Sequence, residues 1–347
     1  MENPYHYRNK VNSAFARKKD GTIISGIYEK GTHKVVPVDE CLLEDQRADA
    51  IIRDIRGLLK SFKIMIYNED SGYGLLRHVM VRTGFASGEI MVVLVCVSPV
   101  FPSKNNFVKA LRKLHPEITT IVLNVNDRTD SMVLGKRDIV LFGRGYIEDE
   151  LCGCTFRISP QSFYQSPARR RKNCTKSHLP GRPHRKRTRP GRLLRNRNHR
   201  LIASRDAREV ISVELNPDAV RDAVTNAKRN QIKNVSFYQN DAGAFMVSMA
   251  EKGEKADVVF MDPPRAGSDE AFLSSVVTLS PKKVVYVSCN PETLARDLRY
   301  LTKHGYKAEE AWGYDMFAWS EHVESIVLLS KLKSNKLKHI KCGIRDG

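Results

Sequence analysis

The sequence lacks the features that mark membrane-spanning and disulfide-stabilised proteins. No apolar run in its 347 residues approaches the roughly 20 residues needed to span a bilayer. The first ten residues, MENPYHYRNK, contain no apolar segment of the kind found in signal peptides. Seven cysteines are too few and too scattered for a disulfide framework in a chain of this length. We therefore expect a cytoplasmic protein whose thiols are available for chemistry, with no membrane partner.

Acidic residues are absent from the stretch 166–200, which holds 14 Lys or Arg and four prolines. The whole chain has a net charge of +19, so subtracting these 14 charges leaves the remainder at +5. The stretch has no hydrophobic periodicity, which predicts a disordered basic loop. Its charge favours a polyanion such as nucleic acid as a partner. A nuclear-localisation or RNA-binding basic run is an alternative interpretation.

The two halves of the chain differ in their pattern of strands and helices. The first half, up to 154, mixes them irregularly, which predicts an α+β domain. The second half alternates strand and helix from 209 onward, which predicts a parallel, doubly wound sheet. We expect domains at 1–154 and 155–335 and a basic tail at 336–347. The expected strands are 22–28, 35–38, 78–83, 90–97, 119–125, 210–214, 235–239, 256–261, 284–288, 307–311 and 325–329, and the expected helices are 48–62, 106–114, 219–230, 293–303 and one ending at 249.

Four chemically capable residues follow predicted strands of the second half: Glu214, Asp241, Asp262 and Cys289. The carboxyl ends of parallel strands meet at one edge of a sheet, where ligands bind in such folds. An acid at this edge can accept hydrogen bonds from ribose hydroxyls or from an adenine amine. Each acid taken alone could equally be a solvated charge.

Two prolines follow Asp262 in the motif Asp262-Pro263-Pro264-Arg265. Proline fixes the backbone and removes an N–H donor, so we expect a rigid turn that displays its carbonyls. Such a turn can hold a nucleobase beside a methyl donor, or it can be an ordinary rigid turn. In amino-group methyltransferases an aromatic residue usually follows the prolines, so Arg265 disfavours that chemistry.

Cys289 ends an apolar strand and precedes Asn290 and Pro291. Buried cysteines are usually inert, but one at a strand end can be a nucleophile. The C5 atom of uracil is a poor nucleophile until a thiolate adds at C6, and a base must later remove the C5 proton. Glu324 is the candidate base, with Glu321 and His322 as its local competitors.

The motifs together resemble those of the RNA uracil-5-methyltransferases that modify transfer RNA and 23S ribosomal RNA. The resemblance runs from about 3 to 332, apart from 166–200. The motifs that carry it are Tyr7-Arg8-Asn9-Lys10, Ile158-Ser159-Pro160-Gln161-Ser162-Phe163-Tyr164-Gln165, Asp262-Pro263-Pro264-Arg265-Ala266-Gly267, Ser288-Cys289-Asn290-Pro291 and His322-Val323-Glu324.

The resemblance implies a Rossmann-like S-adenosylmethionine-dependent methyltransferase domain, preceded by a smaller α+β domain that contacts RNA. It implies an enzyme in which Cys289 is the nucleophile and Glu324 the base, with Arg265 and Asn290 beside a flipped-out uridine. Among RNAs it favours 23S ribosomal RNA over transfer RNA. The residues implied around S-adenosylmethionine are Gln165, Glu214, Asp241 and Asp262.

Two departures from the family pattern bear on cofactors. Many relatives begin with a β-barrel RNA-binding domain and a cysteine cluster that holds an iron–sulfur centre, and this chain starts after both. Cys41 stands where the fourth cluster ligand would be, so we expect it to be a remnant ligand without a cluster and without any metal. The second departure is 166–200, which stands where the family has a Gly-rich cofactor loop.

Reading the basic stretch in another frame recovers the expected loop. A permitted codon choice for 191–200, read one base later, encodes D-A-Y-C-G-I-G-T-I-G. Codons for 169–175, started at the third base, encode Q-T-E-K-L-Y, which the family has after the position of Gln165. We infer an out-of-frame translation of 166–200, which predicts impaired cofactor binding and activity. The alternative function is a non-catalytic, basic RNA-binding protein.

Overall fold

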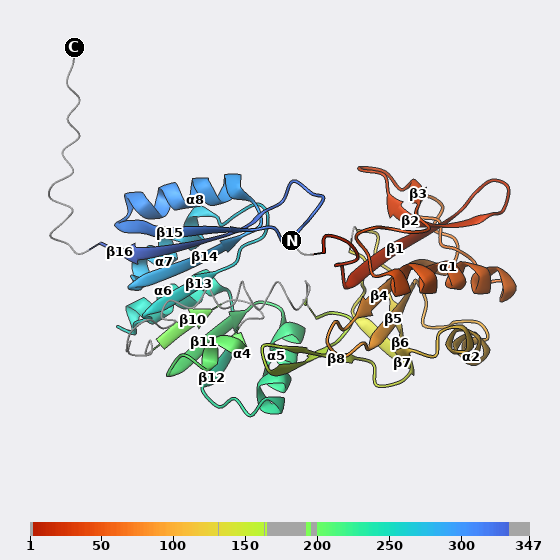
Figure 1. The fold of residues 1–347 in the computed structure, drawn as a ribbon, viewed down its shortest axis with the longest axis horizontal. Helices are drawn as coiled ribbons and strands as arrows, with labels where there is room; N and C mark the ends of the chain where they lie inside the picture. The colour runs from red at the N-terminus through yellow and green to blue at the C-terminus, as the bar shows by residue number, and fades with distance from the viewer. Residues whose placement is uncertain (1–2, 131, 163, 165–191, 196–199, 333–347) are drawn as a thin grey trace, which may run out of the picture. The chain divides into compact units, whose positions relative to one another are not determined.

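The computed structural model describes residues 3–130, 132–162, 164, 192–195 and 200–332, and the chain divides into two compact units, Glu2–Arg171 and Lys172–Gly347 (Figure 1). This division lies further along the chain than the boundary at 154/155 expected from the sequence. The reason is that the strand Cys154–Ile158 pairs with the strand Ile147–Leu151 before it. The expected basic tail at 336–347 lies outside the described residues.

The N-terminal unit is built on a seven-stranded sheet in the order β3-β2-β1-β4-β5-β6-β7, with a separate hairpin β8-β9. In the described part of this sheet β5 and β6 run parallel, and the other neighbouring pairs run antiparallel. Its strands are β1 (Lys10–Arg17), β2 (Ile23–Tyr28), β3 (Val35–Pro37), β4 (Leu76–Thr83), β5 (Ile90–Cys96), β6 (Ile118–Val125), β7 (Arg137–Phe142), β8 (Ile147–Leu151) and β9 (Cys154–Ile158), and its helices are α1 (Gln46–Ser61) and α2 (Lys104–Leu114).

The core of the N-terminal unit follows from the patterns seen in the sequence. Every residue of β5 is buried, as its continuous apolar run predicts. Helix α1 begins after Asp45, whose carboxylate accepts a hydrogen bond from the Arg47 amide, and its face with Ile51 and Ile55 packs into the main core. The strands β1, β7, β8 and β9 were not anticipated from the sequence, although β9 alternates apolar and polar residues.

The C-terminal unit has the doubly wound sheet that the sequence predicts, in the order β12-β11-β10-β13-β14-β16-β15. The strands from β12 to β14 are parallel, and β16 and β15 close the sheet in antiparallel pairs. Its strands are β10 (Arg192–Arg195), β11 (Glu209–Glu214), β12 (Val235–Gln239), β13 (Val258–Met261), β14 (Lys283–Ser288), β15 (Tyr306–Tyr314) and β16 (Glu324–Lys331), and its helices are α4 (Arg200–Ser204), α5 (Pro217–Arg229), α6 (Ala242–Glu251), α7 (Glu270–Leu279) and α8 (Pro291–Lys303).

Strand β10 corrects one expectation from the sequence. The stretch 166–200 was expected to lack regular structure, yet Leu193 pairs in parallel with Val210 of β11 and with Val258 of β13. A strand at this position supplies partners to backbone groups that would otherwise be unpaired in the middle of the sheet. The expectation is therefore wrong for Arg192–Arg195.

Apolar side chains cover both faces of the C-terminal sheet. On one face, helices α6, α7 and α8 pack through Met246, Val276 and Leu301 against alternating residues of the central strands. On the other face, Ala203 of α4 and Met316 pack against Val210 and Phe260. Burial on both faces leaves the strand ends as the place for polar chemistry, and the loops that follow the parallel strands lie at one edge.

Candidate active site

The carboxyl edge of the C-terminal sheet carries the four residues singled out from the sequence. Glu214 ends β11, Asp241 follows β12, Asp262 follows β13 and Cys289 follows β14. Because these strands are parallel, all four lie on the same edge of the sheet. Topology therefore gathers residues that are up to 75 positions apart in the chain.

The antiparallel direction of β16 brings Glu324 to this edge from the far end of the sequence. Ser325 pairs with Ser288, so Glu324 lies one position beyond the last ladder pair, as Cys289 does on the neighbouring strand. Glu321 is exposed, and the ring of His322 packs edge-on against Phe317 with centroids 6.4 Å apart. Of the three candidates for the base, Glu324 is the one whose charge acts on the thiol.

Burial and a neighbouring acid shift the acid–base behaviour of Glu324. Desolvation, with a further contribution from the charge of Asp262, raises the pKa of Glu324 to about 7. A carboxyl group with a pKa near neutrality exchanges protons readily at physiological pH, which is the property that a catalytic acid or base requires.

The same charged groups also shift the pKa of the Cys289 thiol. Burial raises the pKa of Cys289 above its ordinary value, and the negative charges of Glu324 and Asp262 raise it further, while Arg265 lowers it. These effects require the four side chains to lie close together. Cys289, Glu324, Asp262 and Arg265 therefore form one electrostatic cluster, which we call the thiol cluster.

The turn after Asp262 is held by helix α8. The amide nitrogen of Asn290 and the hydroxyl of Thr293 each donate to the Arg265 carbonyl at 3.2 Å. Arg296 donates to the Ala266 carbonyl at 3.0 Å and to the Ser268 carbonyl at 2.9 Å. The expectation that the turn Asp262–Arg265 displays its carbonyls is therefore wrong for Arg265, because α8 already supplies donors to that carbonyl.

A buried carboxylate anchors this arrangement. Asp297 is fully buried and accepts hydrogen bonds from the Ser268 amide at 2.7 Å, from Arg296 Nε at 2.8 Å and from the Tyr286 hydroxyl. Gly267 has φ of +77°, and a Cβ atom there would lie 2.5 Å from Arg296 and 2.9 Å from Asp297. The turn therefore requires glycine at this position and a carboxylate beneath it.

Sequence reasoning missed Asp297, although a signal was present. Leu294 and Leu301 of α8 are buried, and Asp297 lies between them on the same helical face. A carboxylate on an apolar face needs partners, because burying an unpaired charge is costly. A search for polar residues on buried helix faces would have identified it.

Asn290 has a local structural role. Its side-chain oxygen accepts a hydrogen bond from the Glu292 amide at 3.0 Å, which caps α8, and its side-chain nitrogen donates to Arg265. Both ends of the Asn290 side chain are thus used within the protein. Arg265 is exposed and extends from the turn that Asn290 holds.

The two remaining acids lie together on neighbouring strands. Glu214 pairs with Gln239, and the amide of Asn240 donates to the Glu214 carbonyl at 3.2 Å. Asp241 caps α6 by accepting a hydrogen bond from the Ala244 amide at 2.9 Å through one carboxylate oxygen. Carboxylates at two neighbouring strand ends suit the hydroxyl and amine donors of an adenosine group. The segment after β10, Asn-Arg-Asn-His at 196–199, contributes no glycine and lies outside the described residues.

Gln165, the remaining residue expected at the cofactor, also lies outside the described residues. The Cys41 thiol forms no disulfide, and the Cys41 amide donates to Asp49 at 2.9 Å. Within the described ranges no group of three or more His, Cys, Asp or Glu is arranged to hold a metal ion. No helix in those ranges is both long and apolar enough to cross a membrane.

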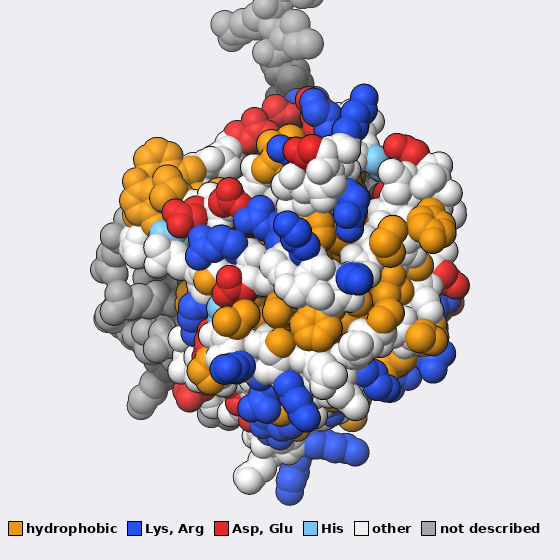
Figure 2. All heavy atoms as spheres, turned by 90° about the vertical axis from the view of Figure 1, so that its right-hand side faces the viewer, with side chains coloured by type: hydrophobic (Ala, Val, Ile, Leu, Met, Phe, Trp, Pro, Cys, Tyr) orange, Lys and Arg blue, Asp and Glu red, His pale blue; other side chains and the backbone are white. Residues whose placement is uncertain are grey.

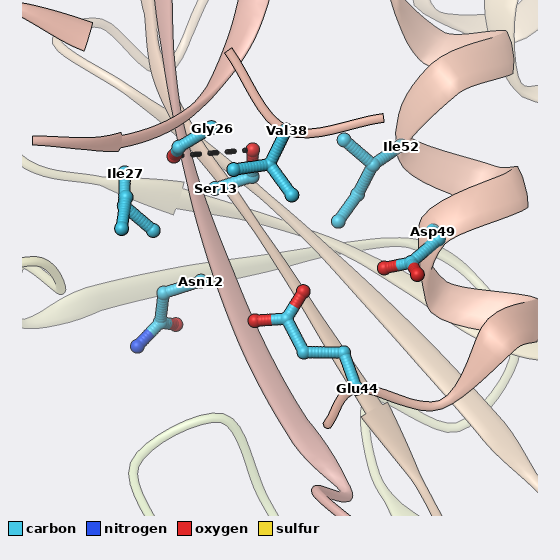
Figure 3. A pocket seen from close by; sticks show the side chains of 8 residues that line it. All are labelled: Asn12, Ser13, Gly26, Ile27, Val38, Glu44, Asp49 and Ile52. Atoms are coloured by element: carbon cyan, nitrogen blue, oxygen red, sulfur yellow. Dashed lines mark hydrogen bonds between the residues drawn. The ribbon is translucent and has the colours of Figure 1, made fainter. Parts of the chain in front are cut away.

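A small cavity in the N-terminal unit holds a second pair of acids. Figure 3 shows Glu44 and Asp49 facing the same space, beside Ser13, whose hydroxyl donates to the Gly26 carbonyl at 3.4 Å. Burial and the charge of Asp49 raise the pKa of Glu44 to about 7. Glu44 belongs to the loop between β3 and α1 and Asp49 to α1, and both are separate from the thiol cluster along the chain.

Comparison with known proteins places this arrangement in a family. The family model described as tRNA (Uracil-5-)-methyltransferase matches residues 2–332. An RNA methyltransferase of Bacillus cereus is 35% identical over 338 residues, which cover 96% of this chain and 72% of the relative. One of Oceanobacillus iheyensis is 37% identical over 337 residues, which cover 96% and 73%. Both relatives carry the name of uncharacterized RNA methyltransferases.

The fold has a counterpart among solved structures. The Pyrococcus abyssi tRNA (uracil-54, C5)-methyltransferase in complex with S-adenosyl-L-homocysteine superimposes with a TM-score of 0.74 at 24% identity, covering 94% of this chain and 77% of that one. This likeness confirms the Rossmann-like α/β fold class expected from the sequence. The matches to the family model and to the relatives confirm the resemblance, and the chain belongs to the tRNA (uracil-5-)-methyltransferase family.

Proposed function

We propose that this chain transfers a methyl group from S-adenosylmethionine to C5 of a uridine in RNA, through a covalent bond between Cys289 and C6 of the uracil. The observation that carries the proposal is the adjacency of Cys289 and Glu324 at the carboxyl edge of the sheet. A thiol and a carboxyl group with a pKa of about 7 are the two groups that the chemistry demands.

Each step assigns a task to a residue of the thiol cluster. The Cys289 thiolate adds to C6, and the electron pair of the C5–C6 double bond moves toward C5 and the O4 carbonyl. S-adenosylmethionine, when bound, supplies the electrophilic methyl that C5 attacks. The Glu324 carboxylate then removes the C5 proton, the double bond re-forms and the Cys289–C6 bond breaks. Arg265 favours the thiolate by its charge.

The donor set at the neighbouring strand ends fits the methyl donor. We propose that Glu214 accepts hydrogen bonds from the ribose hydroxyls and that the free oxygen of Asp241 accepts one from the adenine amine. Asp262, a member of the thiol cluster, lies between these acids and Cys289 in sheet order. Gln165 would complete the set.

The proposal also specifies which RNA is methylated. The resemblance in sequence favours 23S ribosomal RNA, and the matching family model is named for tRNA. Methylation of both transcripts by the same preparation distinguishes them, with 23S ribosomal RNA expected to be the better substrate.

RNA that contains 5-fluorouridine tests the covalent step. With S-adenosylmethionine present, methyl transfer leaves fluorine at C5 in place of the proton, and a base cannot remove it. The bond to Cys289 is therefore trapped, and the adduct migrates as a protein–RNA band in a denaturing gel. Cys289→Ala should abolish the band, whereas Cys96→Ala, at a buried thiol in β5, should keep it. A band that persists in Cys289→Ala would exclude Cys289 as the nucleophile, and binding to RNA with no band from any variant would favour a non-catalytic RNA-binding protein.

A further inference from the structure

Trp319 lies at the middle of the loop that joins β15 to β16, the strands at the blue end of the chain in Figure 1. The loop spans 315–323 between Tyr314 and Glu324, which pair with each other. Trp319 is therefore five residues from Glu324 along the chain, which limits the distance between their Cα atoms to about 18 Å. An indole at this position is within a few nucleotides of any uracil held at the thiol cluster.

The indole is exposed although its neighbours are anchored. Trp319 is 68% exposed, whereas Met316 and Ala318 are 8% and 7% exposed. Met316 belongs to a core cluster of the sheet, and Phe317 packs against the same cluster. The exposure of Trp319 thus does not come from a loose loop, because the residues before it are fixed in the core.

Local hydrogen bonds and backbone conformation turn Trp319 outward. The amide and the hydroxyl of Ser320 both donate to the Phe317 carbonyl, at 3.1 Å and 2.6 Å. Trp319 itself has φ of +64°, a left-handed conformation that is unfavourable for a bulky residue. Strained backbone of this kind persists where the surrounding structure enforces it, and it is concentrated at functional sites.

The other tryptophan of the chain provides a contrast. Trp312 lies in β15, is partly buried and packs against the same core cluster as Phe317. The chain has two tryptophans. One contributes to the core, and the other is exposed in the loop that precedes the proposed base.

The charges of the loop indicate what the ring would contact. The segment 315–323 contains Asp315 and Glu321 and no Lys or Arg. These acids repel phosphate groups, so an RNA strand would present its bases to this loop in preference to its backbone. An aromatic ring and a nucleobase stack without any charge on the protein. Moving a target uridine out of a stack also leaves the faces of its neighbours uncovered.

We propose that Trp319 is a stacking platform for a nucleobase that flanks the target uridine. The inference rests on the proposed function only in taking RNA as the ligand of the thiol cluster. The platform is preorganised, because Met316, Phe317 and Ser320 fix its backbone before RNA arrives. Its contribution is apolar, so it should add affinity without adding to the salt dependence of binding.

Intrinsic fluorescence of a single-tryptophan protein tests the platform. In a Trp312→Phe background Trp319 is the remaining indole, and titration with a short single-stranded RNA with one central uridine should quench it. Trp319→Ala should weaken binding of that RNA about 5- to 100-fold. Trp319→Phe should bind nearly as well as the parent, and Trp319→Leu should resemble Trp319→Ala, because leucine is apolar but cannot stack.

Methyl transfer measured on the same samples separates the platform from the proposed function. Quenching without methyl transfer or a Cys289 adduct would remove the proposed function and keep the platform. Methyl transfer with no quenching and with unchanged RNA affinity in Trp319→Ala would overturn the platform and keep the function. If Trp319→Ala changes mainly the salt dependence of RNA binding and has a smaller effect on the affinity at a fixed salt concentration, the platform is also overturned. That result would indicate a phosphate contact. Far-ultraviolet circular dichroism confirms that each variant is folded.

Discussion

Ser325 of β16 pairs with Ser288 of β14, and this register places Glu324 beside Cys289. One further residue in either strand would turn the carboxylate to the opposite face of the sheet. The juxtaposition of nucleophile and base therefore depends on an antiparallel strand added next to the last parallel one. The backbone pairing of β14 with β16 is therefore enough to bring Cys289 and Glu324 of the thiol cluster together.

Glu324→Gln should separate the two halves of the reaction. The glutamine keeps the shape of the side chain but cannot accept the C5 proton, so turnover should fall about 10²- to 10⁴-fold while the Cys289 adduct still forms. Release of tritium from RNA labelled at C5 of uridine measures the proton step, and a denaturing gel measures the adduct. Glu321→Gln, at an exposed neighbour, should leave both unchanged. Normal tritium release from Glu324→Gln would exclude Glu324 as the base.

The pKa of Glu324 predicts how the rate depends on pH. Burial raises the pKa of this carboxyl group to about 7, and only the ionised form can accept a proton. The single-turnover rate should therefore fall as the pH drops below about 7. The raised pKa of Cys289 makes its thiolate scarce at neutral pH, so the rate should go on rising at alkaline pH. A rate that is independent of pH between about 5.5 and 8 would contradict both assignments.

Asp297→Ala should loosen the turn that follows Asp262. The substitution leaves the Ser268 amide without its acceptor and Arg296 without its buried partner. Because Arg296 is partly exposed, we expect a loss of about 1–3 kcal/mol in the free energy of unfolding, measured by urea denaturation. Arg299→Ala, at an exposed position of the same helix, should change it by less than about 0.5 kcal/mol. Equal stabilities of the two variants would show that Asp297 does not anchor the turn.

Restoring the Gly-rich string should restore cofactor affinity. Replacement of 191–200 by D-A-Y-C-G-I-G-T-I-G should tighten S-adenosylmethionine binding about 10- to 100-fold, because glycine lets the backbone N–H groups approach the ligand. Isothermal calorimetry measures the affinity, and the same string with its glycines changed to alanine is the control. Micromolar binding by the unaltered chain would contradict the expected impairment. Resequencing the gene tests the out-of-frame origin itself, since an intact reading frame without insertions or deletions relative to the relatives would exclude it.

Glu44 should make stability of the N-terminal unit depend on pH. Its pKa is raised to about 7 by burial and by Asp49, so its protonated form is favoured in the folded state. The free energy of unfolding should therefore fall as the pH rises from about 4.5 to 7, by about 1–2 kcal/mol after allowing for partial exposure. Glu44→Gln should remove this dependence and be the more stable protein above pH 7. A parallel decline in both proteins would assign the effect to other groups.

The sequence predicted the features that follow from periodic patterns and strand ends. The buried run of β5, the alternation from β11 to β14 and the positions of Asp241 and Cys289 are visible from residue types alone. The antiparallel direction of β16 is not, because the same apolar pattern suits either direction. The N-terminal strands with mixed polarity were not predicted for a related reason. Pairing with neighbouring strands determines their conformation more than their own composition does.

Long-range polar contacts could not be predicted from the sequence either. The bonds from Asp297 to Ser268 and Tyr286 join three segments whose proximity follows only from the packing of α8 on the sheet. Trp319 could be read as a core residue from its type, and only its exposure in the folded loop indicates a different use.

The position of β10 between β11 and β13 has a consequence for how proteins of this fold evolve. A parallel ladder is made by backbone groups, which every non-proline residue carries, so a replaced segment can still fill the central gap. Cofactor recognition has no such tolerance, because it depends on particular residues at the end of that strand. A lineage can therefore keep the fold of an enzyme after a change that removes its catalysis. Selection acts on the fold and on catalysis separately, so one can be lost without the other.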